Sequence, residues 1–376
     1  MKILIVDTYY DKFLKTFYKK NPDLENRGYD FQIKALLNSN FGTSDTYSYY
    51  FNQNNWEAKD LIVNNFFLQK AWGKDNDFKI SKLRSKIPHK FFKLPIIGKK
   101  LVNKNGLLDI AKQQIKAFKP EILYCQDLSF FPEEILLEIK KENNIRLIVG
   151  QIACPLPPKS FLNPYDLILT SFPHFVDRLR KDGKNCDYFK IGFDQRILSK
   201  TTQNDRDINF SFMGGISKHH NNSLKNIEYL ISKANLEVYG YGAKTLPLGS
   251  IIKKNHNGEK WGTDMYDILS RTKISFNRHI NVAENNANNM RLYEATGMGS
   301  LLMTDQKNNL NELFEIDREI LTYNSKEEAL EKFNYLINNP KEIENIAKSG
   351  QLRTLKEHTY EIRIKELIEI LTKYIK

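Results

Sequence analysis

Residues 285–305, NNANNMRLYEATGMGSLLMTD, place a cluster of asparagines, a short helical pattern and an apolar strand in immediate succession. Asn288 or Asn289 is positioned to cap a helix over roughly 290–296. Gly297 and Gly299 then end this helix and let the chain return to a sheet, where SLLMTD forms a strand. Because the strand-like KISFNRH precedes the asparagines, the stretch predicts a helix that connects two parallel strands.

The same alternation extends outward from this stretch. Short β-rich runs separate helical patterns through residues 1–193: KILIVD, DLIVNN, EILYCQD, RLIVGQ, DLILTS and DYFKIGF. After a polar stretch the pattern restarts with INFSFMGG and NLEVYGYG, and helices are expected near 221–234 and 263–271. Nearly continuous apolar strands between amphipathic helices are typical of a parallel sheet covered on both faces. The sequence therefore predicts an α/β protein with two doubly wound, Rossmann-like domains.

The predicted domain boundaries are as follows: an N-terminal domain over 1–197, a linker over 198–207, a C-terminal domain over 208–357 and a C-terminal helix over 358–376, for which packing back on the N-terminal domain is one option. From Ser325 onward the sequence is helical, and Pro340 is expected to open one helix while Gly350 separates two others.

The length and composition suit two globular domains. The chain has 376 residues, of which 41% are apolar, so two cores can be filled. No apolar run reaches about 18 residues, and the start MKILIVDTYY is a strand pattern that lacks the parts of a signal peptide. These features favour a cytoplasmic location.

The net charge of +12 is concentrated in one stretch, residues 70–104. This stretch contains eleven lysines and arginines against only Asp75 and Asp77, and KIPHKFFKLPIIGKKL interleaves the cations with apolar side chains. Such mixing suits an anionic membrane surface or a lipid-linked acceptor, so the stretch predicts peripheral contact with the inner face of the membrane. The plain alternative is a lysine-rich loop with a solvated helix face. Nucleic acid is disfavoured as a partner because no recognised binding motif accompanies the charge.

Ligands of open α/β sheets bind beyond the carboxyl ends of the strands, where the strand order reverses. Residues that follow predicted strands are therefore candidate site residues: Asp7, Asp127, Gln151 and Ser171 in the first half, and Gly214, Gly215, Gly240, Gly242, Asn277 and His279 in the second. Each type also has a structural interpretation. Glycines after strands permit tight turns, and aspartates can cap the following helix.

The helix near 290–296 is the best candidate for binding a phosphate. Its positive end follows a strand, so it is expected to point into the ligand crevice. Arg291 in the first turn can contact a diphosphate, and Glu294 can accept hydrogen bonds from the vicinal hydroxyls of a sugar. The alternative is an Arg291–Glu294 surface pair with routine helix caps.

The C-terminal half resembles a known family. NMRLYEATGMGSLLMTD, NLNELFEIDREILTY and the helical SGQLRTLKEHTYEIRIKELIEIL look like the C-terminal domain of group-1-like glycosyltransferases with the GT-B fold, particularly the spore-maturation-type subgroup. HNGEKWGTDMYDILSRTKISFNRH is similar to the same subgroup, so the resemblance covers about 255–370. The first half resembles the N-terminal domain of these enzymes more loosely, through LYCQDLSFF, VGQIACPLP and TSFPHFVDRLR.

This resemblance implies a transferase with two domains that face a central cleft. Its C-terminal domain would hold a nucleotide-sugar donor, and its N-terminal domain a glycan, lipid-linked or protein acceptor. It places Glu294 at the donor ribose and Arg291 beside the diphosphate. In related retaining enzymes a second glutamate stands where this chain has Asn286, and Glu284 is two residues away. Sugar identity and stereochemical outcome therefore stay open.

Departure of the nucleoside diphosphate requires positive groups around it. The expected donor-binding residues are Gly214, Gly215, Lys218, Gly240, Asn277, His279, Asn288, Asn289, Arg291 and Glu294, and the catalytic candidates are Asp127, His174 and His279. Asp127, and next His174, could serve as the base that an inverting enzyme needs, whereas a retaining enzyme needs none.

The sequence favours transfer without a metal or other cofactor. It lacks an Asp-x-Asp motif, and the His219–His220 pair lacks matching carboxylates. A glucan-type phosphorylase or an epimerase is disfavoured because their motifs are missing. A catalytically silent module of the same fold, binding sugar nucleotides or a membrane surface, is the main alternative.

Overall fold

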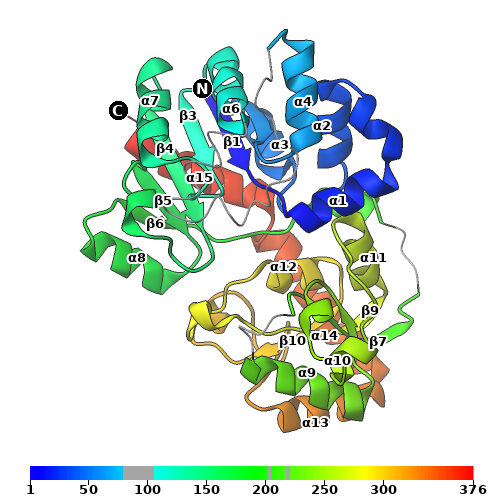
Figure 1. Cartoon of the computed structure of the whole chain (residues 1–376). Helices are drawn as coiled ribbons and strands as arrows, with labels where there is room; N and C mark the ends of the chain where they lie inside the picture. Colours follow the sequence, from blue (N-terminus) through cyan, green and yellow to red (C-terminus); the bar gives the residue numbers. More distant parts are fainter. Residues whose placement is uncertain (79–105, 202–204, 217–220, 376) are drawn as a thin grey trace. The chain divides into compact units, whose positions relative to one another are not determined.

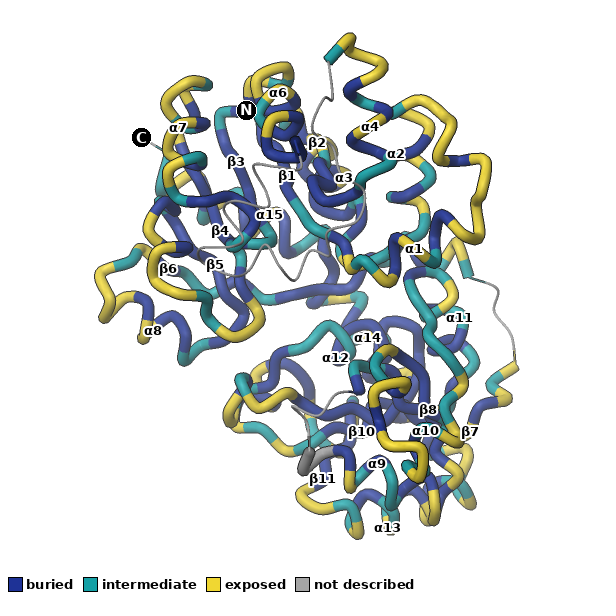
Figure 2. The backbone as a smooth tube through the Cα atoms, in the orientation of Figure 1, coloured by how far each residue is buried: buried dark blue, intermediate teal, exposed yellow. Residues whose placement is uncertain are grey.

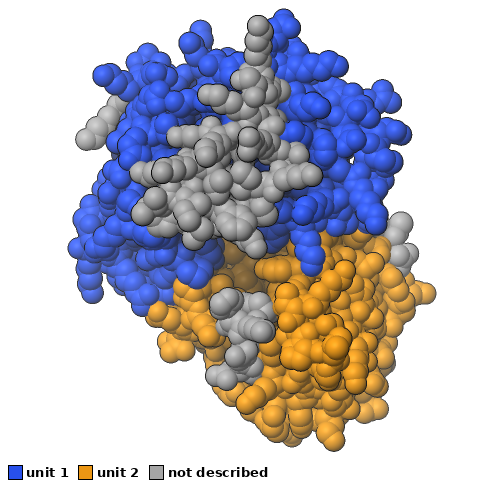
Figure 3. All heavy atoms as spheres, in the orientation of Figure 1, with its two compact units in different colours: residues 1–189, 364–376 blue, residues 190–363 orange. Residues whose placement is uncertain are grey.

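The protein is seen here as a computed structural model that describes residues 1–78, 106–201, 205–216 and 221–375 (Figure 1). The chain forms two compact units, which Figure 3 shows in different colours. Unit 1 contains residues 1–189 and 364–376, and unit 2 contains Lys190–Arg363. Residues 190–197 thus group with the second unit, because the Phe193 amide donates to the His358 carbonyl and the Tyr360 amide donates to the Phe193 carbonyl.

Unit 1 is a six-stranded parallel sheet with the order β2-β1-β3-β4-β5-β6. Its strands are β1 (Lys2–Asp7), β2 (Glu57–Ile62), β3 (Ile122–Cys125), β4 (Leu147–Ile152), β5 (Leu167–Thr170) and β6 (Cys186–Tyr188). Its helices are α1 (Asp11–Lys20), α2 (Tyr29–Leu37), α3 (Thr46–Gln53), α4 (Phe66–Asp75), α6 (Leu107–Phe118), α7 (Glu133–Glu142) and α8 (Pro173–Lys181). The central strands are buried along their length (Figure 2), as expected for apolar strands covered on both faces.

Unit 2 is a five-stranded parallel sheet with the order β11-β10-β9-β7-β8. Its strands are β7 (Ile208–Met213), β8 (Glu237–Tyr239), β9 (Thr272–Phe276), β10 (Leu301–Asp305) and β11 (Leu321–Tyr323). Its helices are α9 (Asn221–Ala234), α10 (Ile251–Lys254), α11 (Thr263–Arg271), α12 (Met290–Gly297), α13 (Lys326–Ile337) and α14 (Pro340–Glu357), and α15 (Tyr360–Tyr374) leads back into unit 1. The predicted pair of doubly wound parallel sheets is confirmed.

The sequence interpretation was wrong at Gly350, which lies inside α14 and does not separate two helices. A Cβ atom at this position would stand 2.3 Å from the carbonyl oxygen of Glu319. The glycine therefore lets the helix pack directly on a neighbouring backbone, and the break between helices comes later, at His358 and Thr359.

Each sheet has one point where the strand order reverses. In unit 1 it lies between β1 and β3, and in unit 2 between β7 and β9. Asp7 ends β1 and Asp127 follows β3, whereas Gly214 follows β7 and Asn277 follows β9. These are the positions at which open parallel sheets bind their ligands.

Within the described residues, no helix has both the length and the apolar character that crossing a bilayer requires. Most of the basic stretch 70–104 lies outside the described residues, which include only its first part, through Phe78.

Candidate functional site

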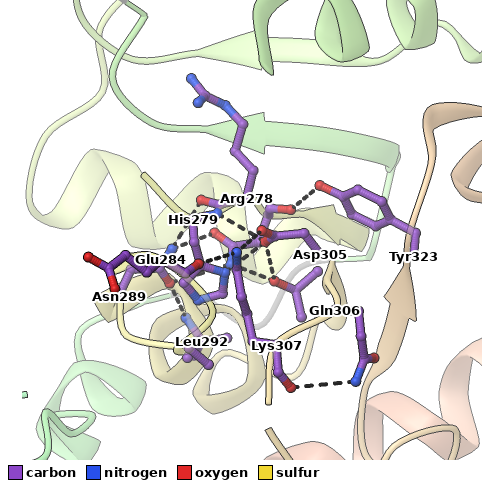
Figure 4. Close-up of polar contacts among 12 residues, drawn as sticks. Arg278, His279, Glu284, Asn289, Leu292, Asp305, Gln306, Lys307 and Tyr323 are labelled. Atoms are coloured by element: carbon purple, nitrogen blue, oxygen red, sulfur yellow. Dashed lines mark hydrogen bonds and ion pairs between the residues drawn. The ribbon is translucent and has the colours of Figure 1, made fainter. Parts of the chain in front are cut away.

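The N-terminus of α12 is tied to the end of β9 by one residue, Asn289 (Figure 4). Its Oδ1 accepts a hydrogen bond from the Leu292 amide over 3.2 Å, so Asn289 is the N-cap. Its Nδ2 donates to Asn277 Oδ1 over 3.0 Å and to the Arg278 carbonyl over 3.2 Å. The first-turn amides of α12 have no partner within the helix and are held at the switch point of unit 2.

Asn277, which accepts a hydrogen bond from the cap residue Asn289, is itself held by two neighbouring strands. Its Nδ2 donates to Thr304 Oγ1 over 2.9 Å, and its carbonyl accepts from the Tyr323 hydroxyl over 2.8 Å. The side chain is 4% exposed and its amide is engaged on both sides. The geometry therefore favours a supporting role for Asn277 over direct ligand contact.

His279 is oriented by Asp305, the last residue of β10 (Figure 4). His279 Nδ1 lies 2.7 Å from Asp305 Oδ1, which also accepts the His279 backbone amide over 3.0 Å. Burial alone would raise the pKa of Asp305, but the hydrogen bond from His279 and the nearby Lys307 lower it below its usual value. The opposite nitrogen, Nε2, is buried without a hydrogen-bond partner among the described residues. An oriented imidazole with an unused nitrogen is suited to contact a ligand.

The asparagine-rich segment before α12 is held by Asn309. Asn309 Oδ1 accepts the Ala287 amide over 2.6 Å, and its Nδ2 donates to the Ala287 carbonyl over 3.3 Å. The adjacent Asn288 is 7% exposed, and its Nδ2 has no partner in the described part of the chain. Asn288 is thus a second buried group with unused donor capacity beside the cap.

Arg291 and Glu294 form an ion pair, with Arg291 Nη1 2.9 Å from Glu294 Oε2. The side chains are only 13% and 6% exposed, so the alternative of a surface pair is wrong. The Tyr266 hydroxyl donates to Glu294 Oε1 over 3.3 Å, and Arg291 Nη2 lies 3.3 Å from Met265 Sδ. Arg291 Nε has no hydrogen-bond partner among the described residues. The guanidinium therefore keeps donor capacity in an environment of low polarity, where an anion would be bound strongly.

The glycines after β7 and β8 bring two loops together. Gly240 has φ +123° and a Cβ there would stand 2.0 Å from the Gly214 carbonyl oxygen. Gly242 has φ +100°, and a Cβ atom there would stand 1.8 Å from the Ile216 carbonyl oxygen. Arg278 Nη2 donates to the Gly215 carbonyl over 3.1 Å and links these loops to β9. Close backbone approach thus accounts for Gly240 and Gly242, whereas a Cβ atom at Gly214 would meet the Phe212 ring. Lys218 lies outside the described residues.

The switch point of unit 1 is acidic. The Thr8 hydroxyl donates to Asp127 Oδ2 over 2.8 Å and its amide donates to Asp7 Oδ1 over 2.7 Å. Ser129 donates to Asp127 Oδ1 from its amide over 2.9 Å and from its hydroxyl over 2.6 Å. Burial raises the pKa of Asp7 to about 7, with the Thr8 amide opposing this shift and the Asp127 charge adding to it. The hydrogen bonds from Thr8 and Ser129 therefore fix the orientation of the Asp127 carboxylate, and the raised pKa of Asp7 favours its protonated form.

His174 lies apart from this pair, at the start of α8. Its ring centroid is 5.3 Å from that of Phe172 and 4.9 Å from that of Phe175. β5, which precedes it, is two strands away from β3 in the sheet. The packing between aromatic rings favours a structural role for this histidine.

The described residues contain no group of three or more His, Cys, Asp or Glu side chains arranged to hold a metal ion. His219 and His220 lie outside those residues.

Sequence reasoning missed three contributors to the site: Tyr266, Asp305 and Asn309. Asp305 ends a strand, so the strand-end rule could have selected it. Tyr266 and Asn309 are far from their partners in the sequence and carry no motif that would have revealed them.

Residues 218–369 match the model of a family described as glycosyl transferase-like. No curated protein matches the chain in sequence. Among solved structures, HepE of Anabaena in complex with UDP and glucose is similar over 99% of both chains, with 13% identity and a TM-score of 0.61.

Two further structures share the fold. Sucrose-phosphate synthase of Thermosynechococcus elongatus is similar over 99% of both chains, with 9% identity and a TM-score of 0.57. UDP-GlcNAc 2-epimerase of Neisseria meningitidis bound to UDP-GlcNAc is similar over 99% of this chain and 100% of its own, with 12% identity and a TM-score of 0.51. The shared fold alone does not separate a transferase from an epimerase. Residues 218–369 thus resemble a glycosyl transferase-like family, and the chain as a whole shares the GT-B fold of these solved structures.

Proposed function

We propose that the protein transfers a sugar from a nucleoside diphosphate sugar, held by unit 2, to a glycan, lipid-linked or protein acceptor, without a metal ion. The observation that carries this proposal is the cap of α12, where Asn289 fixes the first-turn amides at the switch point of the sheet. Arg291 adds hydrogen-bond donors around it, and the unpartnered His279 Nε2 adds another when the imidazole is protonated. A diphosphate matches this set in charge and in hydrogen-bonding capacity.

The chemistry required of unit 2 is stabilisation of a leaving diphosphate. Negative charge develops on this group as the bond to the anomeric carbon breaks. Arg291 supplies a fixed positive charge, the α12 amides supply oriented dipoles, and His279 can donate from Nε2 when protonated. In this proposal Glu294 accepts hydrogen bonds from the ribose hydroxyls. A uridine nucleotide is the first candidate, since HepE and the epimerase are described with UDP or UDP-GlcNAc bound.

For the acceptor, we assign the role of base to Asp127 if the reaction inverts configuration. Its carboxylate accepts hydrogen bonds from the Thr8 hydroxyl and from the amide and hydroxyl of Ser129, which orient it. His174 ranks below it because its ring packs between phenylalanines.

We also propose that the chain belongs to the spore-maturation-type subgroup and acts on a glycan or glycoconjugate acceptor, because residues 255–370 resemble enzymes of that subgroup. The basic stretch 70–104 would bring the enzyme to a membrane that carries a lipid-linked acceptor. Sedimentation with vesicles of neutral or anionic lipid tests this membrane contact. We expect binding to anionic vesicles only, weakened by salt. Failure to bind anionic vesicles, or equal binding to both kinds, would refute the membrane contact.

The central experiment is a thermal-shift screen with UDP, GDP, CDP, ADP and dTDP, with and without magnesium. A ligand that binds only the folded state raises the melting temperature. One diphosphate is expected to do so without magnesium. Glu294→Gln, which keeps the size of the side chain, should reduce that shift, whereas Glu357→Gln, which breaks a separate Arg–Glu pair in unit 2, should not.

Turnover then separates an enzyme from a silent module. The sugar nucleotides of the selected base are incubated with the protein, and release of the diphosphate is followed with and without membrane or glycan extracts. Binding without release under any condition would favour the silent module. No shift with any diphosphate would refute the donor site.

A further inference from the structure

Tyr266 connects α11 to the carboxylate that the donor site uses. Its hydroxyl donates to Glu294 Oε1 over 3.3 Å, while Arg291 Nη1 lies 2.9 Å from Oε2 of the same carboxylate. Each carboxylate oxygen can accept two hydrogen bonds. Glu294 is therefore held from both oxygens and still has acceptor capacity on each.

The Tyr266 hydroxyl can act only as a neutral donor in this setting. Burial and the charge of Glu294 raise the pKa of Tyr266 well above its usual value. The phenol therefore stays protonated, and its hydrogen is directed at the nearest charged acceptor.

Packing fixes the position of this hydroxyl. Tyr266 is 4% exposed, and its ring meets the buried ring of Phe193 edge-on, with centroids 6.4 Å apart. Phe193 also packs on α12, since a Cβ atom at Gly297 would lie 2.5 Å from its ring. One phenylalanine thus contacts both the tyrosine and the helix that carries Glu294. This contact fixes the Tyr266 hydroxyl relative to the Glu294 carboxylate.

We infer that Tyr266 is a positioning residue that sets the preference for ribonucleotides over 2′-deoxyribonucleotides, by holding the Glu294 carboxylate where it can accept the 2′- and 3′-hydroxyls together. This inference rests on the proposed function, in which Glu294 reads the donor ribose. A carboxylate free to rotate would lose the two-point contact with the diol but could still accept one hydroxyl. The loss should therefore fall mainly on the nucleotide that has both hydroxyls.

Tyr266→Phe tests this inference because it removes the hydroxyl and keeps the ring. The probes are UDP, GDP, CDP and ADP, each paired with its 2′-deoxy form, and the tightest-binding pair is compared by calorimetry. The wild type should prefer the ribonucleotide. The variant should lose about five- to tenfold of that preference, through weaker ribonucleotide binding, with 2′-deoxy binding nearly unchanged.

Tyr239→Phe is the matched control, since Tyr239 is also buried and donates to a glutamate of unit 2, Glu237, over 2.6 Å. It should leave both affinities unchanged. Glu294→Asp withdraws the carboxylate by one methylene and should reproduce the loss of preference, which provides a second route if Tyr266→Phe unfolds.

The variants distinguish a failure of the positioning role of Tyr266 from a failure of the proposed donor site. If Glu294→Gln removes the preference but Tyr266→Phe and Glu294→Asp do not, the positioning role is wrong and the donor site stands. Equal weakening of both nucleotides by Tyr266→Phe would also overturn it, because a purely structural role predicts that result. If the wild type binds no diphosphate, or if Glu294→Gln changes nothing, the proposed function fails together with the inference.

Discussion

The two sheets place opposite chemistry at equivalent positions. At the switch point of unit 1 Asp7 ends β1 and Asp127 follows β3, and burial raises the pKa of Asp7 to about 7. At the switch point of unit 2 asparagine amides tie a helix N-terminus to the end of β9, and an arginine lies in the first turn of that helix. The same parallel architecture thus provides one edge suited to accept a proton and another suited to hold an anion. In the proposed reaction, the side chains just beyond the strands, and not the sheets themselves, therefore set which unit accepts a proton and which unit holds the anion.

The largest effect is expected from removing the proposed proton acceptor of unit 1, Asp127. Asp127→Asn keeps the size of the side chain but cannot take a proton, so the rate of diphosphate release in the presence of acceptor should fall about 10²- to 10⁴-fold. Diphosphate affinity, measured by thermal shift, should stay the same. Asp187→Asn, which loses an ion pair with Arg180 elsewhere in unit 1, is the control. An unchanged rate would show that the acidic edge is not catalytic and would favour a retaining reaction.

Removing the cation from the other edge is the next test. Arg291→Met should weaken diphosphate binding about 100-fold, since charge-assisted hydrogen bonds contribute about 1.5–3 kcal/mol each. The single change also leaves Glu294 as a buried, uncompensated charge and should lower stability. The double variant with Glu294→Gln should recover the melting temperature without recovering binding. Recovery of both would mean that Arg291 serves only the fold.

The helix cap sharpens the comparison further. Asn289→Ala removes the bond to the Leu292 amide and should cost about 1 kcal/mol of unfolding free energy. It should also weaken diphosphate binding about tenfold, because the first-turn amides lose the hydrogen bonds through which Asn289 ties them to the end of β9. Ser325→Ala is a matched control, since Ser325 caps α13 by accepting the Glu328 amide over 3.1 Å. Equal stability losses with different binding losses are expected, and equal binding would refute the role of the α12 cap.

The smallest expected effect concerns Asp7 and the pH dependence of stability. Because the folded state raises the pKa of Asp7 from 3.8 to about 7, folding retains a proton that the unfolded chain releases above about pH 4. Stability from this group is therefore present at low pH and lost as the pH rises towards 7. Asp7→Asn should flatten this decline and raise the melting temperature at pH 8 relative to the wild type. Asp182→Asn, in an exposed pair with Lys159, should leave the decline as it is, and an equally steep decline in Asp7→Asn would contradict the assignment.

Local patterns predicted much of the molecule. The alternation of apolar strands and amphipathic helices was sufficient for both sheets, and the asparagines before Met290 predicted the cap of α12 because capping depends on neighbouring residues only. The pairing of Arg291 with Glu294 also followed from helical spacing, although its burial did not. Long-range relations were out of reach. The contacts of Asp305 with His279 and of Tyr266 with Glu294 join separate elements, and the environment of Asp7 depends on which strands become neighbours. Gly350 was misread because its reason is a distant backbone and not a local turn.

The way the chain passes between its units has a consequence for biosynthesis. Unit 2 is one continuous segment, Lys190–Arg363, whereas unit 1 is completed only by residues 364–376 at the far end of α15. Translation proceeds from the N-terminus, so every residue of unit 2 is made before unit 1 has its last segment. The first 189 residues must therefore remain without the last segment of their unit for as long as all of unit 2 is being synthesised.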